Sequence, residues 1–216
     1  MLNEKLHNYL EDLLPDRNEL FLEMESYARE QEVPIMELSG IETMLQLLRI
    51  QKPKKILEVG TAIGYSALRM AVALPDATIV TIERDEQRIK VAEQYIERSQ
   101  KERQILLITG DALNIVNEVG SEGPYDVIFI DAAKGQYQKF FEIYSPFLDK
   151  EGMIITDNVL FKGLVYESEI ENKRIRSLVK KIRSFNEWLM KHDHFHTVIL
   201  PVGDGIAISK KRGDGE

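Results

Sequence analysis

The sequence of 216 residues contains no cysteine and no long apolar run. Without cysteine the chain has neither disulfides nor thiolate metal ligands, and a cytoplasmic location fits that composition. Without an apolar run of about 20 residues, the sequence predicts no membrane-spanning helix. Its first residues are amphipathic and acidic, which is not the pattern of a secretory signal. A net charge of −8 argues against nucleic-acid binding by the whole surface, but it allows a local basic face.

The composition is that of an ordinary globular protein, with 44% hydrophobic and 30% charged residues. We expect one domain over residues 1–216. Within it, residues 1–50 are expected to form a helical cover and residues 54–212 a Rossmann-like core.

The first part of the chain has the apolar spacing of helices. Residues 2–31 predict two helices that are separated by a break at Pro15. A third helix is predicted to run to about Ile50, capped by Ser39 with Glu42 three residues later. The apolar stripe on both sides of the break could cover a substrate site or form a dimer interface. We expect the protein to be a homodimer.

Strands and helices alternate in the rest of the chain. The predicted strands are Lys55–Val59, Thr78–Glu83, Ile105–Thr109, Tyr125–Ile130 and Met153–Thr156. Several of them are continuous apolar runs, as expected where both faces of a sheet are covered. This pattern predicts an α/β fold with a Rossmann-like, doubly wound sheet of seven strands, most of them parallel.

The C-terminal part has a different pattern. A long charged helix is predicted over residues 169–191, with Trp188 in the core. Two strands around Gly203-Asp204-Gly205 predict an antiparallel hairpin at the edge of the sheet. The alternating residues His192, His194 and His196 predict one exposed face of a strand rather than a metal site.

A glycine-rich turn follows the first strand, in the run Glu58-Val59-Gly60-Thr61-Ala62-Ile63-Gly64. Ligands of open parallel sheets bind at the carboxyl ends of the strands, where this turn lies. The run reads E-x-G-x-x-x-G, which differs from the dinucleotide fingerprint G-x-G-x-x-G. A carboxylate before the first glycine repels a pyrophosphate and suits a cationic ligand such as S-adenosylmethionine. A purely structural turn is the alternative.

The motifs ILEVGTAIGYSA, IERD, GDA, DVIFIDAAKGQY, DN and LPVGDGI occur in this order. Their order and spacing resemble the class I S-adenosylmethionine-dependent O-methyltransferases. More narrowly, the sequence resembles the metal-dependent group that includes catechol and caffeoyl-coenzyme A O-methyltransferases. Among bacterial members it is most similar to the enzymes that methylate 5-hydroxyuridine at the wobble position of tRNA. The resemblance covers nearly the whole chain.

This resemblance implies a site for S-adenosylmethionine at the ends of the strands. Glu83, at the end of the second strand, would hold the ribose, and Asp111 and Ala112 would lie by the adenine. Met36 and Ser66 would line the methionine end. The predicted cofactor-binding residues are Met36, Glu58, Gly60, Gly64, Ser66, Glu83, Asp111, Ala112 and Asp131.

Two predicted strands end in residues that could share a cation. Asp131 ends the run DVIFID, and Asp157 and Asn158 end the run GMIITDN. If the strands are neighbours, their ends lie about 5 Å apart, so two carboxylates there need a shared proton or a cation. Oxygen ligands suit Mg²⁺, Mn²⁺ or Ca²⁺. Aspartates that only cap loops are the alternative, whereas the resemblance implies that all three residues are metal ligands.

Lys134 follows Asp131 by three positions, and the resemblance places these two residues at the catalytic centre. A lysine there could take a proton from an acceptor hydroxyl; a solvated loop lysine is the alternative. Ala132 and Ala133 stand where catechol O-methyltransferases have bulkier residues, which predicts a wide entrance.

A cation held at this place would chelate two adjacent acceptor oxygens. Catechols, caffeoyl groups and 5-hydroxyuracil all have such a pair. We therefore expect magnesium-dependent methyl transfer to 5-hydroxyuridine in a tRNA anticodon loop, or to a small vicinal diol. A non-catalytic cofactor-binding or RNA-binding module is a third hypothesis. Glu58 and the missing third glycine argue against a dehydrogenase.

One predicted helix has the charge expected of an RNA contact. Within eleven positions it contains Lys173, Arg174, Arg176, Lys180, Lys181 and Arg183. These residues predict either a tRNA-facing patch or a solvated helix face balanced by Glu167, Glu169 and Glu171. Arg69 and Lys139 are weaker candidates for RNA contact.

Overall fold

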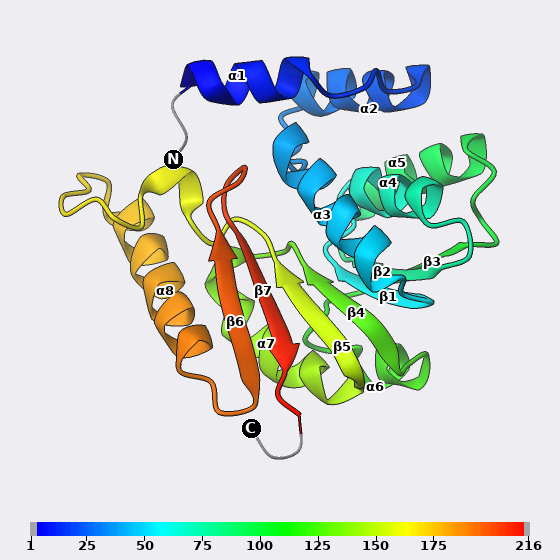
Figure 1. Cartoon of the computed structure of the whole chain (residues 1–216). Helices are drawn as coiled ribbons and strands as arrows, with labels where there is room; N and C mark the ends of the chain where they lie inside the picture. The colour runs from blue at the N-terminus through cyan, green and yellow to red at the C-terminus, as the bar shows by residue number, and fades with distance from the viewer. Residues whose placement is uncertain (1–3, 214–216) are drawn as a thin grey trace.

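One mixed sheet forms the centre of the computed structural model, which describes residues 4–213 (Figure 1). Its strands are β1 (Lys55–Val59), β2 (Thr78–Glu83), β3 (Ile105–Thr109), β4 (Tyr125–Ile130), β5 (Leu148–Thr156), β6 (Phe195–Leu200) and β7 (Ile206–Lys211). Their order is β3-β2-β1-β4-β5-β7-β6, and β7 runs antiparallel to both of its neighbours. The predicted fold class and the C-terminal hairpin are thus confirmed, and β5 begins earlier than predicted.

Helices cover both faces of this sheet (Figure 1). On one side lie α2 (Glu19–Glu30), α3 (Leu38–Gln51), α4 (Tyr65–Ala73) and α5 (Glu86–Arg98). On the other lie α6 (Val116–Ser121), α7 (Tyr137–Tyr144) and α8 (Lys173–Met190). Short 3₁₀ helices follow β4, α7 and β5: η1 (Lys134–Gln136), η2 (Ser145–Phe147) and η3 (Phe161–Gly163). Of the helices that the structure describes, none combines the length and hydropathy of a membrane span.

The N-terminal helix α1 (Glu4–Asp12) lies beside α3, and the chain turns at Pro15 before α2 begins. The predicted break between two helices is therefore confirmed for the described residues. Residues 2 and 3, which the prediction placed in the first helix, lie outside the described part of the chain.

Alternate residues of the central strands point into two separate cores. Ile56 and Phe129 pack with α2 to α5, whereas Leu57 and Ile128 pack with α6 to α8. All four side chains are buried. Burial of each such side chain stabilises the fold by about 1.5–3 kcal/mol. A polar residue inside these strands loses this stabilisation, so its presence points to another role.

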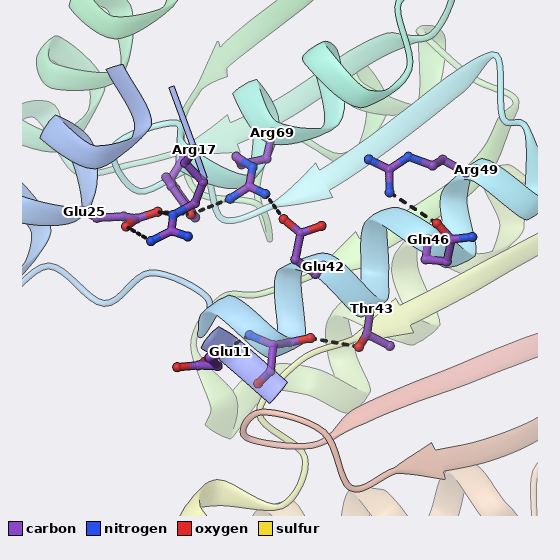
Figure 2. A network of polar contacts seen from close by, with 10 residues as sticks. Glu11, Arg17, Glu25, Glu42, Thr43, Gln46, Arg49 and Arg69 are labelled. Atoms are coloured by element: carbon purple, nitrogen blue, oxygen red, sulfur yellow. Dashed lines mark hydrogen bonds and ion pairs between the residues drawn. The ribbon is translucent and has the colours of Figure 1, made fainter. Parts of the chain in front are cut away.

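The predicted capping box at the start of α3 is wrong. The helix begins one residue before Ser39, so Ser39 lies within its first turn. The backbone N–H of Ser39 donates to Oε1 of Glu11 in α1 at 3.3 Å, and Glu42 pairs with Arg69 instead (Figure 2). The acceptor for this helix start comes from another helix, which the local sequence does not reveal.

Two predictions for the C-terminal part are also corrected. The helix α8 begins at Lys173 rather than at residue 169, because the Asn172 side chain caps it by accepting two backbone N–H bonds. Of the three alternating histidines only His196 lies on β6, so they do not share one strand face. His192 instead packs its ring against Trp188, with the ring centroids 4.8 Å apart.

Arg69 joins three helices from inside the molecule (Figure 2). Its side chain is 7% exposed and pairs with Glu42 of α3. Its Nη1 donates to the Tyr65 hydroxyl at 2.7 Å, and that hydroxyl donates to Oε1 of Glu25 in α2 at 2.7 Å. Arg17 donates to the other oxygen of the same carboxylate at 3.2 Å. The prediction that Arg69 could contact RNA is therefore wrong, because its guanidinium is committed within the fold.

We expect Arg69→Ala to lower the free energy of unfolding by about 2–3 kcal/mol, because it leaves the partly buried Glu42 without its partner and removes a donor to the buried Tyr65 hydroxyl. Urea denaturation measures this change. The matched control is Arg98→Ala, since Arg98 forms an ion pair with Glu23 in which the side chains are 50% and 48% exposed. The loss of this exposed pair should be clearly smaller than the loss in Arg69→Ala. Equal losses in the two variants would contradict the assigned role.

Candidate active site

A cavity of about 620 Å³ lies at the carboxyl ends of the parallel strands. Its wall brings together most of the residues predicted from the sequence: Met36, Gly60, Glu83, Asp111, Ala112, Asp131, Lys134, Asp157 and Asn158. Within the described part of the chain, Glu58, Gly64 and Ser66 are not part of this wall. The cavity therefore joins the predicted cofactor residues to the predicted metal ligands in one space.

The turn after β1 needs glycine because it runs against the backbone of β4. Gly60 has a φ of +110°, and its backbone N–H donates to the Ile82 carbonyl at 3.1 Å. A Cβ at Gly60 would lie 2.1 Å from the Asp131 carbonyl oxygen. Gly64 has a φ of +84° and stands immediately before α4. Gly60 thus lets the end of β1 lie against the end of β4 at the cavity wall, whereas Gly64 provides the left-handed turn into α4.

Glu58 lies beneath this turn and is fully buried. Its carboxyl accepts hydrogen bonds from Ser66 on α4 and from Thr81 on β2. Burial, with smaller contributions from the charges of Asp131 and Glu83, raises the pKa of Glu58 to about 8, although the hydrogen bonds from Ser66 and Thr81 oppose the shift. The sequence predicted a carboxylate that faces the ligand; the structure places it one layer behind the cavity wall, where it supports the turn.

Two acidic side chains line the half of the cavity near β2 and β3. Glu83, at the end of β2, accepts backbone N–H bonds from Ala62 at 2.8 Å, from Arg84 at 2.9 Å and from Asp85 at 3.0 Å. The backbone N–H of Leu113 lowers the pKa of Asp111, as does its ion pair with Arg84. Backbone donors therefore fix both carboxylates before any ligand binds, in positions suited to a nucleoside.

The other half of the cavity lies between β4 and β5. These strands pair in parallel with Ile130 opposite Thr156, so Asp131 and Asp157 leave the sheet side by side. The backbone N–H of Asp157 donates to the Ile130 carbonyl at 3.1 Å. Burial raises the pKa of Asp131, and it raises the pKa of Asp157 strongly, with the charge of Asp131 adding to the effect.

This pair of carboxylates fits a divalent cation. Asn158 follows with a φ of +57° and directs its amide oxygen toward Lys134, whose Nζ donates to it. The available donors are thus two carboxylates and one amide, all of them hard oxygen ligands. Residues 4–213 contain no cluster of three or more histidine, cysteine or acidic side chains placed to hold a metal. A cation here would need water and substrate as further ligands, as is usual for Mg²⁺.

Two acidic residues of the cavity wall, Glu37 and Asp204, were not predicted from the sequence. Asp204 is 8% exposed, and its carboxylate accepts the backbone N–H of Lys162. Its carbonyl accepts the N–H of Leu160 at 2.9 Å, so it anchors the loop that follows Asn158. The signal was present, because an antiparallel β7 beside β5 must begin at the edge where the parallel strands end. The sequence predicted a hairpin turn at Gly203-Asp204-Gly205, within the motif LPVGDGI, but no role for Asp204 in the site.

Comparison with known proteins agrees with this geometry. The family model for O-methyltransferases matches residues 13–212. A catechol O-methyltransferase of Niastella koreensis is 33% identical over 217 residues, which cover 95% of this chain and 96% of the relative. A crystal structure from Staphylococcus aureus, provisionally assigned as a caffeoyl-CoA O-methyltransferase, is 41% identical with a TM-score of 0.91 over 96% of this chain and 100% of that one. A Podospora anserina methyltransferase with bound S-adenosylhomocysteine is 26% identical with a TM-score of 0.85, over 97% and 95% of the two chains.

We expect Glu58→Gln to change how stability depends on pH. Between about pH 4.5 and about pH 8 the folded protein keeps a proton on Glu58 that the unfolded chain has lost. The contribution of Glu58 to stability is therefore present below pH 4.5 and is lost as the pH rises through about 8. The glutamine of the variant does not titrate, so the difference in free energy of unfolding should shift toward the variant between about pH 6 and about pH 9.

Urea denaturation at the two pH values measures this shift. Glu93→Gln is the matched control, because Glu93 is exposed on α5. That control should show the same difference from the wild type at both values. A pH-independent difference for Glu58→Gln would show that this carboxyl is charged in the folded protein at neutral pH.

Proposed function

Because this chain belongs to the O-methyltransferase family, we propose that its acceptor is the 5-hydroxyl of 5-hydroxyuridine at the wobble position of tRNA. The chain is an S-adenosylmethionine-dependent O-methyltransferase. The product of the proposed reaction is 5-methoxyuridine. One observation carries the choice of an RNA acceptor: Lys134 and Gln136 of the cavity wall also line a second hollow, which is lined by further lysines.

Residues at the β2 and β3 side of the cavity are suited to the nucleoside part of the methyl donor. Glu83 is held by three backbone N–H groups and faces the cavity, where it can accept hydrogen bonds from ribose hydroxyls. Asp111 and Ala112 line the neighbouring wall, which is the position for the adenine. Gly60 lets the donor approach the backbone closely.

At the β4 and β5 side, Asp131, Asp157 and Asn158 would hold a divalent cation, with Mg²⁺ preferred. When bound, such a cation lowers the pKa of an acceptor hydroxyl and orients two neighbouring oxygens. We assign Lys134 as the general base, because its amine lies at Asn158, at the edge of the donor set. Most of the acceleration would come from holding the acceptor oxygen in line with the methyl group.

The shape of the acceptor end favours a base from a flexible RNA. The 5-hydroxyl and 4-carbonyl of 5-hydroxyuracil are adjacent oxygens, as the donor set requires. A base in an anticodon loop is single-stranded and can be turned out of its stack into a pocket. Ala132 and Ala133 present only small side chains at the wall, which supports a wide entrance.

A small vicinal diol is the second candidate acceptor. The names of two similar proteins support it: the Niastella koreensis relative is called a catechol O-methyltransferase, and the Staphylococcus aureus structure is assigned to caffeoyl-CoA. The same donor set and the same base would serve a catechol, because its two oxygens are also adjacent.

Transfer of labelled methyl from S-adenosylmethionine tests the proposal. The acceptors are tRNA containing 5-hydroxyuridine, the same tRNA without it, and a caffeoyl or catechol compound. We expect label only in the hydroxylated tRNA, with a loss of at least about a hundredfold when a chelator is added. Asp157→Ala should show a loss of the same order while still binding S-adenosylmethionine, which calorimetry measures.

Label in the small phenol alone would contradict the RNA acceptor and leave the family chemistry in place. Full activity in chelator, or in Asp157→Ala, would contradict the cation site. The tRNA without the hydroxyl controls for methylation at other positions.

A further inference from the structure

A second hollow of about 470 Å³ lies beside the active-site cavity, between η1, the first turn of α7 and the middle of α8. Lys134 and Gln136 line both spaces, so η1 is the wall between them. Anything that enters the cavity past Lys134 and extends outward along this wall reaches the hollow next.

Three lysines from two helices surround this hollow. Lys139 comes from α7, and Lys180 and Lys181 come from α8. Lys181 lies against η1, since a Cβ at Gly135 would be only 3.5 Å from its Nζ. The ammonium group of Lys181 thus lies close to the wall that separates the hollow from the active site.

Within residues 4–213, these three lysines have no hydrogen bond or ion pair. All three side chains belong to exposed residues. Glu142 also lines the hollow, but it accepts a hydrogen bond from Gln138 at 2.8 Å. Besides Lys134, the hollow therefore has three lysines and one carboxylate in its lining.

The basic residues of α8 do not all have the same role. Arg183 donates to the Val165 carbonyl at 2.6 Å and to the Glu167 carbonyl, so it holds the segment before α8. Across the described residues, no ion pair links Glu167, Glu169 or Glu171 to the cations of α8. The sequence left open that these three glutamates balance the charge of the helix, but they form no ion pairs with it among the described residues. Lys180 and Lys181 therefore remain available to a ligand.

We propose that this hollow binds the phosphodiester groups that flank the methylated nucleotide. The inference rests on the proposed function, and it names the residues that would favour a polynucleotide acceptor over a free nucleoside. Ammonium groups bind phosphate as point charges, without demanding a fixed base sequence. The three lysines lie on the far side of η1 from the active-site cavity. They could therefore hold the RNA backbone outside the cavity while the target base enters it.

The test is the triple variant Lys139→Ala/Lys180→Ala/Lys181→Ala, assayed on a 5-hydroxyuridine-containing anticodon stem-loop and on the free nucleoside 5-hydroxyuridine. We expect the ratio of kcat/KM for RNA to kcat/KM for nucleoside to fall at least about tenfold. The slope of log KM for RNA against log salt concentration should flatten by about 0.7 for each lysine that contacts a phosphate. The arginine variant at the same three positions should recover most of the ratio, because the charges are kept.

The matched control removes three exposed lysines far from the hollow, in Lys54→Ala/Lys90→Ala/Lys150→Ala. It changes the net charge equally and should leave both the ratio and the salt slope at the wild-type values. A fall of the same size in this control would assign the effect to overall charge and overturn the inference.

The other outcomes separate this inference from the proposed function. Suppose that the wild type methylates the RNA and that the triple variant keeps the wild-type kcat/KM ratio and salt slope. The hollow then does not bind the RNA backbone, although the proposed RNA acceptor is confirmed. If the wild type methylates neither RNA nor nucleoside, the proposed function fails and the inference fails with it. If the wild type methylates a caffeoyl-CoA ester instead and the triple variant loses that activity, the lysines bind coenzyme A phosphates and the RNA assignment is overturned.

Discussion

The parallel pairing of β4 with both β1 and β5 is the constraint on which the site depends. This register aligns Ile130 with Val59 on one side and with Thr156 on the other. The next residues, Gly60, Asp131 and Asp157, therefore leave the sheet together at one edge. The contact is so close that only glycine fits at position 60, where a Cβ would meet the Asp131 carbonyl oxygen at 2.1 Å. Any side chain there would force apart the two strands that hold the cofactor end and the acceptor end together.

The chemistry of the site follows from the burial of negative charge at this edge. Burial raises the pKa of Glu58, Asp131 and Asp157 alike; the charge of Asp131 adds to the shift of Glu58 and Asp157, and the charge of Asp204 adds to that of Asp131 and Asp157. Neighbouring buried carboxylates are stabilised in their charged form by positive charge, whether from a sulfonium or from a divalent cation. Lys134 already supplies one such charge and opposes the upward shift in the pKa of Asp131. The strand order therefore places carboxylates together where they favour binding of the cationic ligands that we propose.

The parallel strands were predictable from sequence because each is a mostly apolar run that ends at, or just before, a glycine or an acidic residue, and the bounds of β1 to β4 were predicted correctly. What depends on distant partners was not predictable. The start of α3 relies on Glu11 from another helix, and Arg69 is buried because Glu42 of α3 comes to meet it. Asp204 joins the site only because β7 returns antiparallel to β5. The positions of the site residues followed from strand ends, whereas their roles came from a resemblance and stay predictions until ligands are bound.

The most direct test of this account is a crystal structure with S-adenosylhomocysteine and Mn²⁺, with the metal located by its anomalous scattering. The account predicts a peak at about 2.0–2.3 Å from oxygens of Asp131, Asp157 and Asn158, and a ribose within hydrogen-bond distance of Glu83. Cofactor bound at Glu83 with no anomalous peak, or with the peak at other residues, would contradict the claim that the neighbouring ends of β4 and β5 form a cation site.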